Sequence, residues 1–205
     1  MQLYEVSDTL NQPYEVHLSE VINFPLHWHY YSEILYIKKG SIRIHCNEKS
    51  HVLQEGDLCY FYPLQLHEIS NTEDAAVEYT MVKFDFHTLT LPPTHQTKLY
   101  DYFIHRTSSD DFCILIKKDR LMNSPMETYM NHILTTYQTK DDFYSLQMQA
   151  DLYSILIEIA KRSEESSYLQ EIVKDVETKE ELFERLQINE QTGYDAIEEY
   201  LETHD

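Results

Sequence analysis

The sequence predicts a mainly β protein, in which an antiparallel barrel or sandwich comes first and helices follow. Up to about His87, short apolar runs alternate with turn residues. The run SIRIHC (41–46) places apolar residues at every second position, which is the period of a strand. Closely spaced strands of this kind favour an antiparallel sandwich or barrel. The proline pair in LPPTHQ (91–96) disfavours both helix and central strand, and the sequence after it has a helical pattern.

The chain has only three glycines, and two of them lie between predicted strands. Gly40 follows two lysines, and Gly56 lies in the turn QEGDL (54–58). A sequence this poor in glycine is expected to use it where a positive φ or a close approach of the backbone requires it. Both positions are therefore predicted corners of the β region.

Two helices are predicted after the proline pair. The first begins with the signal Ser124, Pro125 and Glu127, which are an N-cap serine, a proline at the first helical position and a capping-box glutamate. The second is predicted over residues 142–161. Its apolar stripe consists of Phe143, Leu146, Ala150, Tyr153, Ile157 and Ala160, widened by Leu152, Leu156 and Ile159. Its polar face consists of Gln147, Asp151, Ser154, Glu158 and Lys161. Such a broad apolar face must pack against the barrel or against a second subunit.

Composition excludes several classes of function. The net charge of −20 over 205 residues repels phosphate backbones, and no basic helix or helix-turn-helix pattern is present, so this stretch of chain is not expected to bind nucleic acid itself. No apolar run is long enough to span a membrane, and the N-terminus lacks the pattern of a signal peptide. Three scattered cysteines predict reduced thiols in a cytoplasmic protein. From Ser163 onward, 14 acidic against 3 basic residues predict a solvated helical segment.

The stretch HWHYYSEILYIKKG (27–40) carries the strongest chemical signal. His27, His29 and Glu33 are separated by two and four positions, so on a single strand all three point to one face. Two imidazoles and a carboxylate on one face suit Fe(II), Mn(II), Ni(II) or Zn(II), and His67 is a candidate fourth ligand. The alternative is that these four residues hydrogen-bond one another or a ligand without metal, because burying them without partners is costly.

The same residues carry a resemblance to a known fold. His27, His29, Glu33 and Gly40 match the pattern His-x-His-x3-Glu-x6-Gly, which resembles the first cupin motif. The second cupin motif, with its glycine, its proline and a His-x3-Asn ending, is resembled by Gly56, Pro63, His67 and Asn71. Pro63 is displaced by one position, and Gln65 stands where glycine is expected. The resemblance implies a cupin, which is a jelly-roll-like β-barrel, here followed by a C-terminal helical hairpin.

An acidic, aromatic-rich cupin followed by helices resembles the N-terminal sensor half of AraC-type (AraC/XylS) bacterial transcription regulators. HWHYYSEILYIKKGSIRIHC (27–46) and the ending GYDAIEEYLETHD (193–205) are similar to that group. The resemblance implies a barrel sensor over residues 1–95, a helical dimerisation region over 96–162, and an acidic helical segment over 163–205 that leads to a DNA-binding domain absent from this sequence. It further implies a small-molecule, sugar-like effector, a homodimer, DNA contact only through the absent domain, and no catalysis.

The ligand pocket is expected to include the four motif residues together with Tyr36, Arg43 and Tyr60. The tyrosines offer rings and hydroxyls to a sugar, and Arg43 can pair with a carboxylate or with hydroxyls. The alternative for each tyrosine is an ordinary place in the barrel core or rim. Two other functions stay open at this point: a metal-dependent cupin enzyme, such as a dioxygenase or isomerase, and a dimerisation scaffold with an empty barrel.

Overall fold

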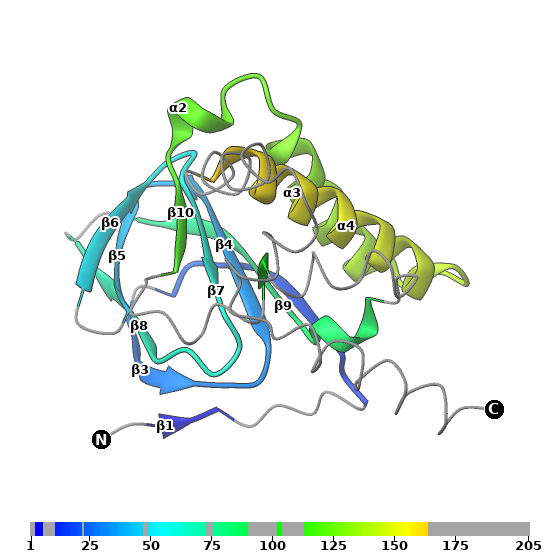
Figure 1. Cartoon of the computed structure of the whole chain (residues 1–205), viewed down its shortest axis with the longest axis horizontal. Helices are drawn as coiled ribbons and strands as arrows, with labels where there is room; N and C mark the ends of the chain where they lie inside the picture. The colour runs from blue at the N-terminus through cyan, green and yellow to red at the C-terminus, as the bar shows by residue number, and fades with distance from the viewer. Residues whose placement is uncertain are drawn as a thin grey trace, which may run out of the picture. The chain divides into compact units, whose positions relative to one another are not determined.

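The computed structural model describes residues 3–5, 11–21, 23–46, 49–72, 76–89, 102–103 and 113–163. Within them, the strands form two five-stranded sheets (Figure 1), with the orders β1-β3-β8-β5-β6 and β10-β7-β4-β9-β2. The first sheet contains β1 (Leu3–Tyr4), β3 (Phe24–Trp28), β8 (His67–Asn71), β5 (Ser41–Cys46) and β6 (Lys49–Gln54). The second contains β10 (Ile114–Ile116), β7 (Leu58–Phe61), β4 (Ser32–Lys39), β9 (Glu78–Phe84) and β2 (Tyr14–Ser19). Neighbouring strands are antiparallel, except that β1 runs parallel to β3. The predicted barrel is confirmed.

The two sheets face each other across a shared hydrophobic core. Ile42 and Ile44 of the first sheet pack with Leu35 and Ile37 of the second, and all four are fully buried. Strand β4 alternates between two environments, because every second side chain points into this core and the others point to the outer face of the sheet. The inward set includes Glu33, so the barrel core and the candidate site share one face of β4.

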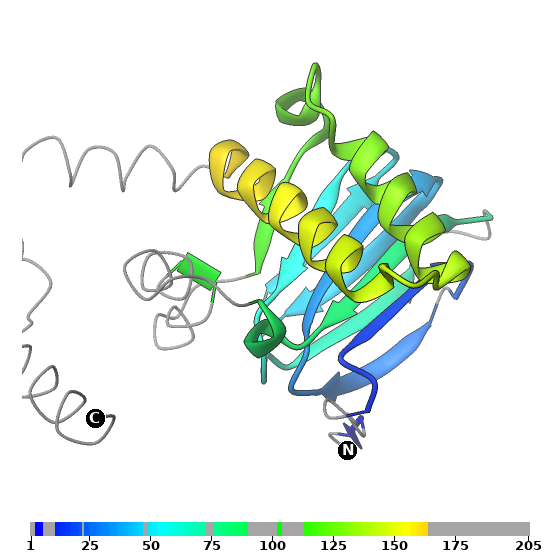
Figure 2. The ribbon, with the colours of Figure 1, turned by 90° about the vertical axis from the view of Figure 1, so that its right-hand side faces the viewer.

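The outer face of the second sheet is covered by helices. After the 3-10 turn η1 (Phe86–Thr88) and β10 come α2 (Lys118–Leu121), α3 (Met126–Thr139) and α4 (Tyr144–Arg162). Figure 2 shows α3 and α4 side by side across this sheet. A second hydrophobic cluster joins α3 and α4 to the second sheet. It includes Ile34 and Val82 on the strands and Met130 and Leu156 on the helices. The predicted order, barrel first and helical hairpin second, is confirmed.

Helix α3 begins at Met126 with Pro125 as its N-cap, one residue later than the sequence predicted, and no side chain caps the helix from that position. The hydroxyl of Ser124 still accepts the N–H of Met126 at 3.2 Å. In contrast, the predicted apolar face of α4 is wrong in part. Phe143 and Leu146 are 72% and 69% exposed. The buried face is rotated toward Met148, Leu152, Ile155, Leu156 and Ile159, and it also includes Asp151 and Glu158.

Asp151 is buried although the sequence placed it on the polar face. It accepts hydrogen bonds from Thr136 and Gln147, each at 3.0 Å, and lies 2.8 Å from His132 Nδ1. These partners satisfy the carboxylate between α3 and α4, and burial of a paired carboxylate is tolerated where burial of an isolated one is not. Apolar residues occur on two adjoining faces of α4, so periodicity alone did not identify which face the barrel covers.

Strand β10 lies within the span 96–162, for which only helices were expected. Ile114–Ile116 pairs antiparallel with β7, as Ile114 lies opposite Tyr60 and Ile116 opposite Leu58. A strand of three residues is too short to show a period, so it was missed. The predicted acidic helices beyond Ser163 lie outside the described residues.

Gly40 and Gly56 form the corners that the sequence predicted, with φ of +75° and +88°. A Cβ at Gly40 would lie 2.5 Å from the carbonyl oxygen of Ala76, so position 40 requires glycine for space as well as for conformation. Among the described helices, none combines the length and the apolar character that crossing a membrane requires.

Candidate metal centre and ligand cavity

Four buried side chains from the two sheets meet inside the barrel. His27 of β3 lies directly opposite His67 of β8. His29 follows β3, and Glu33 reaches the same space from β4. One ligand atom of each residue lies within 4.8 Å of the corresponding atoms of the other three. The structure therefore brings together all four residues that the two motifs singled out.

The route by which they converge differs from the expectation of a single strand. β3 ends at Trp28 and β4 begins at Ser32, and the two strands belong to different sheets. The chain turns a corner between them, where Tyr30 is 54% exposed. His29 occupies the start of this corner, so Glu33 faces the histidines across the barrel rather than along one strand.

Each imidazole is oriented by a backbone carbonyl. Nδ1 of His27 lies 2.8 Å from the carbonyl oxygen of Pro25, Nδ1 of His29 lies 3.0 Å from that of Tyr31, and Nδ1 of His67 lies 2.8 Å from that of Gln65. A carbonyl oxygen only accepts, so each Nδ1 carries the hydrogen. In the neutral rings, all three Nε2 atoms then present lone pairs toward the centre, as ligating histidines do.

The carboxylate of Glu33 brings a negative charge into the buried centre, and a cation would balance that charge. Its Oε2 lies 2.8 Å from His29 Nε2 and 3.3 Å from His67 Nε2. Burial raises the pKa of Glu33, but the hydrogen bonds with His29 and His67 and the charge of Lys83 outweigh burial and hold that pKa well below its usual value. Because each Nδ1 already carries a hydrogen, a further proton on Nε2 or a metal ion would join the imidazoles directly to the carboxylate. The donor set therefore fits a divalent metal ion.

His27 does not supply that proton at neutral pH. Burial, and after it the neighbouring His67, lower the pKa of His27 from 6.5 to about 4. A neutral imidazole is the form that binds a metal ion. His27 is thus in the ligating form without any rearrangement.

The turn before β8 departs from the usual cupin sequence, and the structure shows how it is built. Leu64, not a glycine, takes the positive φ of 65°, and its N–H donates to the carbonyl of His29 at 2.8 Å. The side chain of Gln65 accepts the N–H of Tyr62 at 3.0 Å. The carbonyl of Gln65 is the one that orients His67, so His67 reaches the centre despite the altered motif.

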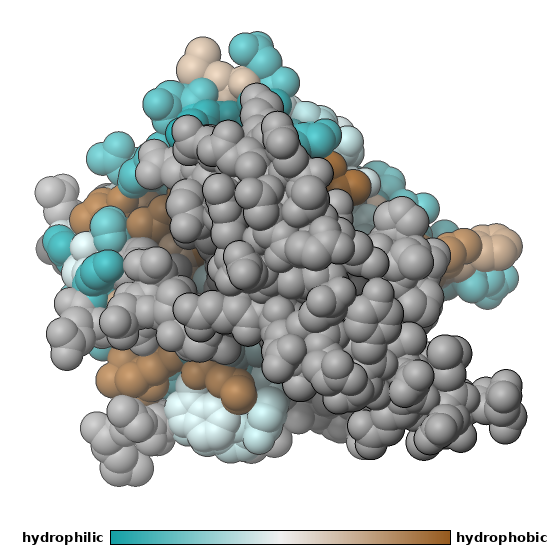
Figure 3. All heavy atoms as spheres, viewed as in Figure 1, coloured by the Kyte–Doolittle hydropathy of each residue, from teal (hydrophilic) through white to brown (hydrophobic). Residues whose placement is uncertain are grey.

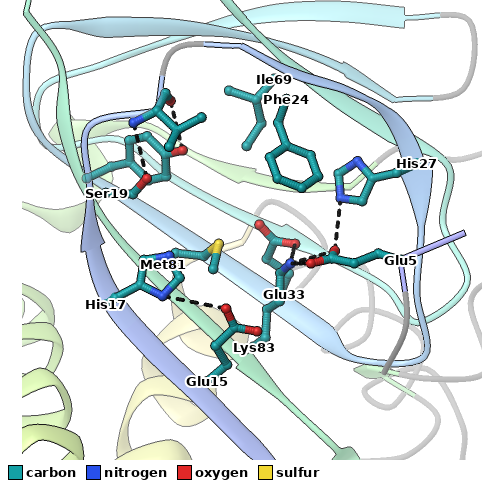
Figure 4. A pocket seen from close by; sticks show the side chains of 12 residues that line it. Glu5, Glu15, His17, Ser19, Phe24, His27, Glu33, Ile69, Met81 and Lys83 are labelled. Atoms are coloured by element: carbon teal, nitrogen blue, oxygen red, sulfur yellow. Dashed lines mark hydrogen bonds and ion pairs between the residues drawn. The ribbon is translucent and has the colours of Figure 1, made fainter. Parts of the chain in front are cut away.

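A cavity of about 170 Å³ opens beside this centre (Figure 4). His27, Glu33 and Lys83 lie at its polar end, and Phe24 and Met81 belong to its apolar wall. The remaining lining residues are Glu5, Glu15, His17, Ser19, Val21, Ile69 and Tyr79. Drug-sized ligands occupy pockets of roughly 300–1,000 Å³, so this cavity suits a smaller molecule.

A buried lysine and a glutamate from the N-terminal strand complete the polar end of the cavity. Lys83 Nζ donates to both carboxylate oxygens of Glu5, at 2.8 and 2.7 Å, and lies 4.0 Å from Glu33 Oε2. Glu5 Oε2 also lies 3.5 Å from His27 Nε2. Figure 4 shows Glu5 between His27 and Lys83.

The other expected pocket residues lie elsewhere. Tyr36 and Tyr60 point to the outer face of the second sheet and pack in the cluster beneath the helices. The Tyr60 hydroxyl lies 2.8 Å from Ser32 Oγ, so its polar end is satisfied there. Arg43 alternates with the inward-facing Ile42 and Ile44 and therefore faces away from the barrel interior.

Sequence reasoning missed Glu5 and Lys83. A signal for Lys83 exists, because β9 reads EYTMVKF and Lys83 has the same parity as the inward-facing Met81. A lysine on the inner face of an apolar strand is a candidate site residue. Glu5 had no such signal, since only the pairing of β1 with β3 brings it to the centre.

The fold and the site together define a cupin barrel with a ligand cavity. The family model of the AraC-like ligand binding domain matches residues 19–156, and the chain belongs to this family. The match covers β3 to β10 and most of α4, so it includes the four residues of the centre. No curated protein sequence matches the chain.

Several solved structures are similar to part of the chain. A cupin 2 conserved barrel domain protein from Salinispora arenicola is 21% identical, with a TM-score of 0.33, over 40% of this chain and 72% of that one. A cupin protein from Bacteroides fragilis is 22% identical, with a TM-score of 0.35, over 40% and 75% of the two chains. A mutant of Bacillus subtilis oxalate decarboxylase is 34% identical, with a TM-score of 0.26, over 29% of this chain and 17% of that one.

Proposed function

We propose that this chain is the effector-sensing and dimerisation part of an AraC-type transcription regulator in the cytoplasm. The observation that carries the proposal is the cavity of about 170 Å³ beside the buried centre, in a chain that belongs to the AraC-like ligand binding domain family. A small molecule binds in this cavity and changes how linked DNA-binding domains are presented. DNA contact belongs to those domains, since the chain itself carries a net charge of −20.

The chemistry of the cavity favours a small, hydroxyl-rich ligand of the sugar type. Glu15, His17 and Ser19 on β2 offer hydrogen-bonding groups along one wall, and Tyr79 adds a ring. Three carboxylates against one lysine make an anionic ligand unfavourable in the metal-free cavity. A neutral polyhydroxyl compound satisfies these groups without adding negative charge.

Strand β2 supplies a physical link between the cavity and the helices. Glu15, His17 and Ser19 line the cavity, whereas Tyr14 and Val16 lie in the cluster on the opposite face of the sheet. The ring of Tyr14 lies 6.3 Å from the ring of Tyr144 at the start of α4. A ligand that moves β2 therefore acts on α4 directly, which is the coupling that a sensor needs.

The exposed face of α4 supports a homodimer. Phe143, Leu146, Ala150 and Ile157 recur at spacings of three, four and seven, which is one face of a helix. Figure 3 shows apolar side chains at the end of the helical pair, where Phe143 and Leu146 are 72% and 69% exposed. We propose that these four residues contact a second copy of the chain.

We further propose that His27, His29, Glu33 and His67 hold a divalent ion of Fe, Mn, Ni or Zn. The support is the convergence of three oriented Nε2 atoms on one ionised carboxylate. The same centre supports a second function, that of a metal-dependent cupin enzyme such as a dioxygenase or isomerase. That function requires turnover of a substrate by the metal-loaded chain, whereas a sensor binds its ligand unchanged.

A thermal-shift screen with sugars, sugar derivatives and metal ions tests the sensing function. A ligand present at 100 times its Kd raises the free energy of unfolding by about 2.7 kcal/mol. The variant Val21→Trp fills the cavity at a residue that is 46% exposed and lines it, so the shift should disappear. Leu18→Trp is the matched control, because Leu18 is 41% exposed on β2 and does not line the cavity. A shift that survives in Val21→Trp, or a ligand that the chain consumes, contradicts the sensing function.

A further inference from the structure

Glu5 is held by backbone pairing at the edge of the candidate metal centre. β1 pairs parallel with β3, with Leu3 opposite His27 and Tyr4 opposite Trp28, and the N–H of Glu5 donates to the carbonyl of Trp28 at 3.0 Å. The Tyr4 ring packs against Trp28 with centroids 4.7 Å apart. Since successive side chains alternate, Tyr4 packs outside the barrel and Glu5 points inside.

The carboxylate of Glu5 faces the Nε2 atoms of two of these histidines. Oε2 lies 3.5 Å from His27 Nε2 and 4.0 Å from His29 Nε2. In the neutral tautomers, which the carbonyl partners of Nδ1 select, both Nε2 atoms carry lone pairs. A carboxylate and two imidazoles that direct lone pairs into the same space can bind a cation there.

The separations are close to those of ligands that share one ion. Metal bonds to histidine nitrogen and carboxylate oxygen are about 2.0–2.2 Å, so two ligands lie about 3.0 Å apart at right angles and about 4.2 Å apart in opposite positions. The distances from Glu5 to the two histidines fall within this range. The distances of 2.8 Å from Glu33 to His29 and 3.3 Å to His67 are close to the lower end.

We propose that Glu5 is a fifth protein ligand of the ion held by His27, His29, Glu33 and His67, delivered by the N-terminal strand. Lys83 is the positioning residue, because it donates to both oxygens of Glu5 and fixes the direction of the carboxylate. A cavity ligand that binds the ion would then compete with Glu5 for it. This inference rests on the metal-binding part of the proposed function.

Titration of the full chain with Co(II) tests the proposal, with affinity and the visible d–d spectrum as two readouts. Glu5→Gln removes the charge and keeps the size of the side chain, and we expect Co(II) to bind about 10- to 100-fold more weakly with altered d–d bands. Glu15→Gln is the matched control, since Glu15 lines the same cavity but pairs with His17 at 3.6 Å. It should match the unaltered chain in both readouts. Near-UV circular dichroism checks that each variant is folded.

The other outcomes decide against the proposal in different ways. An unchanged affinity in Glu5→Gln, or a weaker affinity with an unchanged spectrum, shows that Glu5 is not a ligand and overturns the proposal. An equal loss in Glu15→Gln assigns the effect to the charge of the cavity and also overturns it. His67→Ala tests the centre itself: if this variant binds Co(II) as tightly as the unaltered chain, the metal centre fails and the role of Glu5 fails with it.

Discussion

Lys83 donates to both carboxylate oxygens of Glu5, at 2.8 and 2.7 Å, although the two residues are 78 positions apart in the sequence. Lys83 is 2% exposed, and its Nζ also lies 4.0 Å from Glu33 Oε2. Burial lowers the pKa of Lys83, but the charges of Glu33 and Glu5 outweigh burial and hold it above the usual value. A single ammonium group therefore balances two carboxylates at the wall of the cavity.

Replacing Lys83 by methionine should destabilise the protein strongly. The change leaves Glu5 and Glu33 facing each other without the lysine, and loss of one partner of a buried pair costs about 3 kcal/mol or more. Urea unfolding measures the free energy. Lys161→Met is the matched control, because Lys161 pairs with Glu158 at 3.1 Å while 63% exposed, and it should cost less than about 1 kcal/mol. Equal losses in the two variants would refute the structural role of Lys83.

The metal-free protein should lose stability as the pH falls from about 6.5 to about 4. The folded pKa of His27 is about 4 against 6.5 for an unperturbed histidine, because burial and then His67 disfavour the imidazolium. The unfolded chain therefore binds a proton in this window that the folded chain does not, and stability falls as the pH is lowered. The loss approaches about 3 kcal/mol.

Denaturant unfolding at about pH 7.5 and about pH 4.5, with chelator present, measures this loss. His27→Gln should lose less stability over the same interval than the unaltered chain. His45→Gln is the control, because His45 lies on β5 with the parity of the outward-facing Arg43 and should behave as the unaltered chain does. A similar loss in His27→Gln would mean that His27 does not cause the pH dependence.

The exposed apolar residues of the α4 region, Phe143, Leu146, Ala150 and Ile157, predict the oligomeric state. We expect a dimer in sedimentation velocity, and we expect Leu146→Lys to convert it to a folded monomer, because Leu146 is 69% exposed and is one of these residues. Met122→Lys is the control, since Met122 is 63% exposed outside α4. An unaltered chain that sediments as a monomer, or a Leu146→Lys variant that stays dimeric, contradicts the assignment of this face.

The two glycine corners should respond differently to alanine. Gly40→Ala places a Cβ 2.5 Å from the backbone oxygen of Ala76, whereas Gly56→Ala meets the side chain of Lys118 at 2.7 Å. The left-handed conformation costs about 1–2 kcal/mol in both variants, and the backbone clash adds to it only at Gly40. Thermal unfolding should therefore show the lower Tm for Gly40→Ala. The reverse order would show that the Ala76 contact is relieved easily.

Local patterns in the sequence predicted much of the fold. Strand periodicity and the two positive-φ glycines each depend on residues near one another in the sequence, and both were confirmed. The start of α3 was predicted to within one residue. The convergence of His27, His29, Glu33 and His67 was likewise indicated by motif spacing. The four side chains converge because the chain turns a corner between two sheets, whereas the sequence predicted that His27, His29 and Glu33 share one face of a single strand.

The features that the sequence did not predict depend on contacts between distant segments of the chain. Tyr36 and Tyr60 lie under the helices because α3 and α4 cover the second sheet, and no property of those tyrosines shows which face will be covered. Glu5 reaches the centre only through the pairing of β1 with β3. The buried face of α4 was misplaced for the same reason, since two adjoining apolar faces are equally periodic.

The measurement that tests the central claim most directly is the dissociation constant of the dimer with and without a cavity ligand. Analytical ultracentrifugation across a concentration series gives it, with the ligand found in the thermal-shift screen. Coupling through β2 predicts a change of at least about 5-fold, the lower end of typical allosteric couplings, and no change in Val21→Trp. A ligand that binds in the cavity and leaves the dimer constant of the unaltered chain unchanged would contradict the account of this chain as a sensor.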